Sequence, residues 1–132
     1  MKTGFINGCF DILHIGHIRM LQFAKNRCDK LIVAIDEDSR VKKLKGLSRP
    51  FNNQNDRVEF LRAIRCVDDV RMFSTDKELI DLIKNISPDI MIVGSDYRNK
   101  NVIGSEYAKK LLFFERIGDY STSKIFEYSC NR

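Results

Sequence analysis

The segment TGFINGCFDILHIGHIRMLQFAKNRC, residues 3–28, contains an apolar run, a turn and a helical pattern in that order. The run Thr3–Asn7 is short, and Gly8 interrupts it. Residues 17–28 then place apolar side chains near a 3.6-residue period, which predicts an amphipathic helix. The turn between them holds both histidines of the chain, so we expect the functional site in this turn.

The rest of the chain repeats this alternation of strand and helix. Apolar runs separated by helical patterns imply βαβ units with right-handed crossovers. The sequence therefore predicts an α/β fold: a single domain over residues 1–132, built as a Rossmann-like three-layer α/β/α sandwich around a parallel sheet. Further strands are predicted at 31–35, 70–73, 90–93 and about 111–115, and helices at 56–65, after Thr75, at about 105–110 and from about Thr122.

Local signals bound some of these elements. Thr75 followed by Glu78 fits a capping box at the start of a helix, and Pro88 ends that helix. Residues 36–55 are polar and basic, with Gly46 and Pro50 as breakers, and we predict a long, partly mobile loop there. A long loop inside a compact domain usually has a function.

The composition suits a basic globular protein. Its 132 residues carry 23 Lys and Arg against 18 Asp and Glu, a net charge of +5 that favours an anionic partner. The four cysteines are widely spaced, which favours reduced thiols over disulfides. No apolar run reaches the roughly 18–20 residues that a membrane span needs, and no secretory signal is evident, so we expect a cytoplasmic protein.

The expected sheet also indicates where a ligand would bind. In open parallel sheets, ligands lie beyond the carboxyl ends of the strands at the point where the strand order reverses, which selects residues 7–17 and 94–97. His14 and His17 flank Gly16 just before a helix, where imidazoles can donate hydrogen bonds to an anion that the helix N-terminus attracts. Gly16 would let the backbone approach a phosphate closely.

Two other interpretations of this turn stay open. It could be a purely structural junction, in which one histidine caps the helix and the other is exposed. A zinc site formed by Cys9, His14 and His17 is a third interpretation, although the sequence offers no clear fourth ligand.

The turn resembles a known signature. Gly8-Cys-Phe-Asp11 followed by His14-Ile-Gly-His17 is similar to the G-x-F-D turn and HxGH motif of the cytidylyltransferase-like nucleotidyltransferase superfamily. The resemblance implies that both histidines contact the nucleotide phosphates and stabilise charge on the α-phosphate during transfer. It also implies nucleotide binding by the turn residues Gly8, Cys9, Phe10, Asp11 and Gly16.

Further segments resemble the adenylyltransferase domain of ADP-heptose synthase. They are KKLKG at 42–46, Arg49-Pro50, Asp56-Arg57, GSDY at 94–97 and VIG at 102–104, with Ser95 where that family usually has Gly. Taken alone, such a lysine cluster is more often a solvated basic loop, but its position on a long loop facing the expected site favours a function. The resemblance implies a catalytic role for Lys45, substrate binding by Lys43, either acceptor binding or loop bracing by Arg57, and nucleotide binding by Gly94, Asp96 and Tyr97.

The stretch RIGDYSTSKI, residues 116–125, points to a second family. It resembles the R-T-x-x-I-S-T-T-K-I ending of glycerol-3-phosphate cytidylyltransferases, with Ile117 in place of Thr. The resemblance implies a catalytic role for Arg116 and nucleotide binding by Ser121 and Thr122. The two hydroxyls could also simply cap the C-terminal helix.

These resemblances imply a nucleotidyltransferase that moves a nucleoside monophosphate from an NTP to a phosphorylated sugar or alditol and releases pyrophosphate. They also imply Mg²⁺ bound mainly through the NTP phosphates, no metal held by the protein itself, and a homodimer. The longer match favours ATP and a heptose 1-phosphate, whereas the Arg116 ending favours CTP and glycerol 3-phosphate. A non-catalytic nucleic-acid-binding module is the alternative from another class, but aromatic residues do not interleave with the basic ones as in a stacking platform. We therefore expect neither a nucleic acid nor a membrane as partner.

Overall fold

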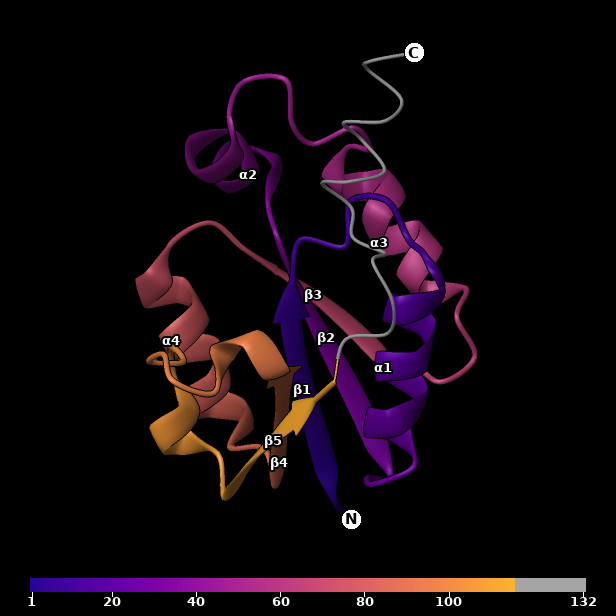
Figure 1. Cartoon of the computed structure of the whole chain (residues 1–132), viewed down its shortest axis with the longest axis vertical. Coiled ribbons are helices and arrows are strands. Elements are labelled where there is room, and N and C mark those ends of the chain that lie inside the picture. The colour runs from indigo at the N-terminus through magenta and orange to yellow at the C-terminus, as the bar shows by residue number, and fades with distance from the viewer. Residues whose placement is uncertain (116–132) are drawn as a thin grey trace.

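The computed structural model describes residues 1–115, apart from the side chain of Asp96, and its strands form one parallel sheet (Figure 1). The order across the sheet is β3-β2-β1-β4-β5, so β1 and β4 are neighbours at the point where the order reverses. Every pairing is parallel, which confirms the predicted sheet. The strands of this described part are β1 (Thr3–Gly8), β2 (Lys30–Asp36), β3 (Asp69–Phe73), β4 (Ile90–Gly94) and β5 (Lys110–Phe114).

Helices cover both faces of the sheet, as the three-layer prediction requires (Figure 1). On one face, α1 (Ile15–Lys25) and α3 (Gln54–Arg62) pack on the core side chains of Ile6, Leu31 and Val33. On the other face, α4 (Asp76–Ile86) packs on Phe5, Ile32 and Ala34. Successive residues of β1 and β2 thus point to opposite layers, and this is why these strands read as continuous apolar runs.

Capping explains where two helices begin. Thr75 accepts a hydrogen bond from the Glu78 amide at 3.1 Å and caps α4, as predicted. The Glu78 carboxylate accepts from the Ser74 amide at 2.7 Å, one residue earlier than a capping box would place it. Helix α1 starts at Ile15, two residues before the predicted helix, because His14 acts as its N-cap.

The prediction of a loop over residues 36–55 is wrong. Residues Asp38–Lys45 form helix α2, and α3 already begins at Gln54. The sequence does not predict α2 because Val41 is its one buried residue, and a single buried position shows no helical period. Partners elsewhere hold the helix instead: the Asp38 amide donates to the side chain of Gln54 at 2.8 Å, and the Asp38 carboxylate pairs with Arg57 at 2.7 Å.

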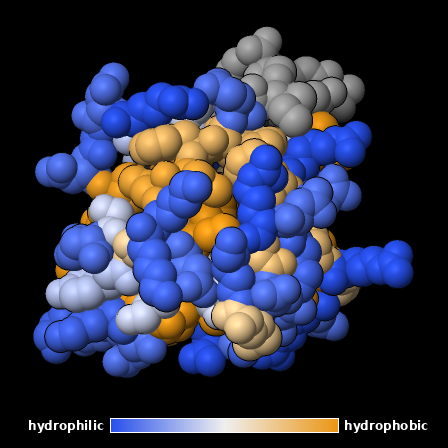
Figure 2. Space-filling view, turned by 90° about the horizontal axis from the view of Figure 1, so that it is seen from below, coloured by the Kyte–Doolittle hydropathy of each residue, from blue (hydrophilic) through white to orange (hydrophobic). Residues whose placement is uncertain are grey.

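The remaining elements are short. A 3₁₀ turn, η1 (Ser95–Tyr97), follows β4 directly, and a second one, η2 (Ser105–Tyr107), stands where the sequence suggested a short helix. The expected C-terminal helix from about Thr122 lies outside the described residues. No helix in residues 1–115 is long and apolar enough to cross a membrane. The face at the amino ends of the strands is largely hydrophilic around a smaller apolar area (Figure 2).

Candidate active site at the carboxyl ends of β1 and β4

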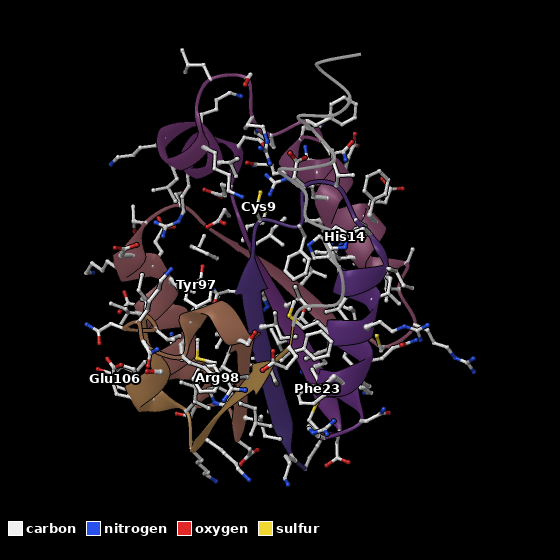
Figure 3. All side chains as sticks on the ribbon, viewed as in Figure 1. Cys9, His14, Phe23, Tyr97, Arg98 and Glu106 are labelled. Atoms are coloured by element: carbon white, nitrogen blue, oxygen red, sulfur yellow. The ribbon has the colours of Figure 1, made fainter. Side chains whose placement is uncertain are left out.

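A cavity of about 490 Å³ opens at the carboxyl ends of β1 and β4, which is where the strand-order argument places a ligand. Cys9, His14 and Tyr97 mark three sides of this region in Figure 3. The structure brings the following predicted residues together in its lining: Gly8, Cys9, Phe10, His14, Gly16, His17, Lys45, Gly94 and Tyr97.

The two imidazoles are held by the start of α1 itself. His14 Nδ1 accepts a hydrogen bond from the Gly16 amide at 3.1 Å, and His17 Nδ1 accepts from the His14 amide at 3.2 Å. The ring centroids lie 4.0 Å apart. Because each Nδ1 is an acceptor, a neutral ring carries its proton on Nε2, the nitrogen that can donate to an anion.

Gly16 is needed for a reason that the sequence did not reveal. A Cβ at this position would lie 2.8 Å from His14 Cε1 and 2.9 Å from His14 Nδ1. The absence of a side chain therefore makes room for the capping imidazole. The Gly16 amide itself donates to His14 Nδ1, and the expected approach of a phosphate to this backbone stays a prediction.

Phe10 shapes the turn from within. Its φ of 50° lies in the left-handed region, which is uncommon for a residue with a side chain. The ring is buried, and its centroid lies 5.2 Å from that of His17. Packing in the core thus holds a strained backbone position directly beside the imidazoles.

Asp11 is a fully buried carboxylate that ties the turn to the segment before α3. Its oxygens accept hydrogen bonds from the Phe51 and Asn52 amides, both at 2.8 Å, and from Arg49 Nε at 3.3 Å. The Asn52 side chain donates in return to the Asp11 carbonyl at 2.7 Å. Asp11 therefore organises the turn, and its carboxylate lies outside the cavity lining.

Arg57 is also fully buried, so the structure supports bracing and not acceptor binding. Its guanidinium donates to the carbonyls of Cys9 at 2.9 Å, Asp36 at 2.7 Å and Asn52 at 3.0 Å. The fourth bond joins it to the Asp38 carboxylate at 2.7 Å. These bonds engage Nε, Nη1 and Nη2 and fasten the first turn, the end of β2 and the start of α2 to α3. The expectation of substrate binding by Arg57 is corrected accordingly.

The two lysines expected at the site lie in different places. Lys45, the last residue of α2, lines the cavity, whereas Lys43 is exposed and lies outside the lining. The positive φ of Gly46, 108°, ends the helix directly after Lys45. Lys45 therefore brings a positive charge to the cavity wall.

The second predicted segment follows β4. Gly94 and Tyr97 line the cavity, and Ser95 begins the 3₁₀ turn that carries Tyr97 there. The backbone of Asp96 lies in the same turn. Arg116, Ser121 and Thr122 lie outside the described residues, so their expected roles stay predictions.

The thiol of Cys9 faces the cavity but is not poised to react. Burial raises its pKa above the usual 9.0, against the opposing effects of Lys45 and Arg57. A neutral thiol is a poor nucleophile and a poor metal ligand. Among the described side chains, which leave out that of Asp96, no group of three His, Cys, Asp or Glu residues could hold a metal ion, and both histidines use Nδ1 to cap α1.

The sequence reasoning missed several lining residues, of which Asp36 and Arg40 are the charged ones. Asp36 ends β2, the strand next to β1, so the switch-point argument could have found it. Arg40 could not have been found in this way because it lies on α2, a helix that the sequence does not predict. Met20 of α1 and, after β4, Asn101 and Ile103 also line the cavity.

Comparison with known proteins agrees with this geometry. The model of the cytidylyltransferase-like family matches residues 5–127, so the chain belongs to that family and is a nucleotidyltransferase by class. The curated relatives include the bifunctional protein HldE of Helicobacter hepaticus, 47% identical over 126 residues, and that of Campylobacter fetus subsp. fetus, 46% identical over 121 residues. These alignments cover 96% and 92% of this chain but 26% of either relative. The chain thus spans about a quarter of their length.

Solved structures share the fold. The lipopolysaccharide core biosynthesis protein from Thermoplasma volcanium superposes with a TM-score of 0.68 at 24% identity, covering 92% of this chain and 99% of that one. A bifunctional NMN adenylyltransferase/ADP ribose pyrophosphatase from Francisella tularensis superposes with a TM-score of 0.71 at 12% identity, covering 98% of this chain and 42% of that one. At these identities the likeness concerns the fold alone.

Proposed function

We propose that this chain transfers AMP from ATP to a heptose 1-phosphate, forming an ADP-sugar and pyrophosphate. The observation that carries the proposal is the pair of imidazoles in the cavity at the N-terminus of α1, with Lys45 on the same cavity wall. The 47% identity to an HldE protein over 96% of the chain and the ADP-heptose synthase segments support the choice of substrates.

The reaction requires positioning and neutralisation of charge more than an acid or a base. A phosphate oxygen of the acceptor attacks the α-phosphorus of ATP in line, and pyrophosphate leaves from the opposite side. His14 and His17 donate through Nε2 to oxygens of the α-phosphate, where negative charge builds up. Lys45 binds the β- and γ-phosphates, and Arg116 adds positive charge in the same role.

Mg²⁺ would enter with the nucleotide. The described lining contains cationic groups that can bind phosphate, and one carboxylate, that of Asp36, but no cluster of carboxylates. This lining fits an ion that is held mainly by phosphate oxygens. Bound in that way, the ion would neutralise charge on the leaving pyrophosphate. The nucleoside would lie against Gly94 and Tyr97 at the end of β4.

Pyrophosphate release measured with Mg²⁺, ATP or CTP, and heptose 1-phosphate or glycerol 3-phosphate tests the proposal in a grid of four reactions. Release with ATP and heptose 1-phosphate is the expected result. Release with CTP and glycerol 3-phosphate would favour the second candidate, to which the sequence RIGDYSTSKI at 116–125 points. Silence in all four reactions would overturn both. If the protein releases no pyrophosphate but binds random oligonucleotides in a salt-sensitive way, the nucleic-acid-binding module would be favoured.

A further inference from the structure

The β2 side of the cavity carries a charged pair that the proposed chemistry does not yet use. Asp36, at the end of β2, and Arg40, in α2, both line the cavity, and Arg40 Nε donates to Asp36 Oδ1 at 2.8 Å. Their side chains are 17% and 14% exposed. Both groups are thus largely withdrawn from bulk water and face the space that a substrate would occupy.

Arg40 is unsuited to binding a phosphate because two carboxylates already share it. Its Nη2 donates to Asp76 Oδ1 at 2.7 Å, and its Nη1 donates to the Ser74 carbonyl at 3.4 Å. The Arg40 guanidinium is thus already paired with Asp36 and Asp76 and is not left open for a phosphate. On the wall that carries His14, His17 and Lys45, the cationic groups face the cavity instead.

Asp36 is suited to accepting a hydrogen bond from a hydroxyl group. Arg40 holds Oδ1, and within residues 1–115 no donor contacts Oδ2. Burial raises the pKa of this carboxyl above its ordinary 3.8, although Arg40 works in the opposite direction. A hydrogen bond from a hydroxyl group to such a charged oxygen contributes more than a bond between neutral groups.

The position of Asp36 indicates which substrate brings that hydroxyl. The sheet order places β2 and β4 on opposite sides of β1, and the imidazole turn follows β1 between them. The proposed nucleoside subsite at Gly94 and Tyr97 lies on the β4 side. The acceptor attacks the α-phosphorus, which lies between the two sides. Since the nucleoside takes the β4 side, the sugar of the acceptor would lie on the β2 side.

We propose, on the basis of the proposed function, that Asp36, fixed by Arg40, determines acceptor specificity by accepting a hydrogen bond from a sugar hydroxyl through Oδ2. The cavity thereby divides into a region for phosphates at His14, His17 and Lys45 and a corner at Asp36 for the hydroxylated body of the acceptor. Asp36 acts on substrate binding, and Arg40 positions it.

Steady-state pyrophosphate release with ATP and heptose 1-phosphate tests this assignment in Asp36→Ala and Asp36→Asn. We expect Asp36→Ala to raise the KM for heptose 1-phosphate by about 10- to 100-fold, with kcat and the KM for ATP within about threefold of the parent. Asp36→Asn keeps an acceptor oxygen in the same shape and should lose less. The matched control is Asp69→Asn, since Asp69 is held by Arg71 Nε at the same 2.8 Å but lies outside the lining.

Monodeoxy analogues of heptose 1-phosphate test the same contact without a mutation. With the parent protein, one analogue should have a KM higher than that of heptose 1-phosphate by a similar factor. With Asp36→Ala, the KM of that analogue should equal the KM of heptose 1-phosphate. A rise in the KM for ATP or in the Mg²⁺ requirement at an unchanged acceptor KM would overturn the assignment. So would an active parent whose acceptor KM is insensitive to every change. A parent that is silent with every acceptor would overturn the proposed function and this assignment together.

Discussion

Two segments that wall the cavity are held in place in different ways. The imidazoles of His14 and His17 are fixed by atoms of their own turn, since each Nδ1 accepts from an amide within three residues. The earlier part of the same turn, at Cys9 and Asp11, is bonded to distant residues. Helix α2 and the segment up to α3 depend on distant partners: Arg57 reaches the Cys9 carbonyl across 48 residues, and Asp11 reaches the Asn52 amide across 41. The imidazoles are thus placed locally, whereas Lys45, Asp36 and Arg40 are placed by tertiary structure.

His17→Asn tests the locally placed imidazoles and should have the largest effect of these variants on turnover. Asn can keep an acceptor near the position of Nδ1 for the His14 amide but lacks the Nε2 donor. We expect kcat to fall by about 10³-fold because one donor to the transition-state charge is lost. Pyrophosphate release gives the rate, and an unchanged urea unfolding curve shows that the fold is kept. Turnover within tenfold of the parent would refute the role of His17.

Arg57→Met tests the long-range half. We expect the free energy of unfolding to fall by about 2–4 kcal/mol, because three carbonyls and the Asp38 carboxylate lose a buried donor. Urea unfolding measures the change. Arg62→Met on the exposed side of the same helix is the control and should stay within about 0.5 kcal/mol. Equal unfolding midpoints for the two variants would show that Arg57 braces nothing.

Gly16→Ala tests whether the position of the His14 ring within the turn matters for the rate. The new methyl would meet the His14 ring at 2.8 Å and displace it, so we expect kcat to fall by about 10- to 100-fold. Stability should change little, because the preference of a helix for Ala over Gly, about 1 kcal/mol, is offset by the loss of the His14 cap hydrogen bond, which costs about as much. Ile15→Ala is the neighbouring control, since its side chain is 43% exposed and lies outside the cavity. A normal rate for Gly16→Ala would mean that the position of His14 is not critical.

Asp68→Asn gives the smallest expected effect. Although burial works in the opposite direction, hydrogen bonds from Lys25 and from the Leu31 amide hold the pKa of Asp68 below its ordinary 3.8. A lowered folded-state pKa adds stability above pH 3.8, and this stability is lost as the pH falls through the folded value. Because the pair is about one-third exposed, we expect at most about 1 kcal/mol at pH 7.

Thermal unfolding of the parent and Asp68→Asn from pH 7 down to about pH 2 checks this prediction. The two curves should converge at the acid end. Asp81→Asn, which removes a carboxylate 3.6 Å from Lys77 on the exposed face of α4, should unfold like the parent at pH 7. A difference between parent and Asp68→Asn that persists unchanged in acid would show that the ionised carboxylate is not the stabilising group.

Much of the fold could be predicted from the sequence because its signals are local and periodic. The apolar runs at 31–35 and 90–93 match the cores of β2 and β4, and Thr75 caps α4. Helix α2 could not be predicted because a helix with one buried residue shows no apolar period. Its hydrogen-bond partners, Gln54 and Arg57, lie far along the chain. Breakers such as Gly46 and Pro50 then suggested a loop.

The family and the position of the imidazole turn follow from neighbouring residues in the chain, because a strand, a turn and a helix with two histidines three residues apart specify each other locally. Tertiary structure alone decided that Arg57 and Asp11 are buried braces and that Asp36 and Arg40 face the cavity. The reason is physical: a charged side chain in the sequence shows its chemistry but not its partners. Only the packing of α2 and α3 against the sheet decides whether such a charge braces the fold or faces the substrate.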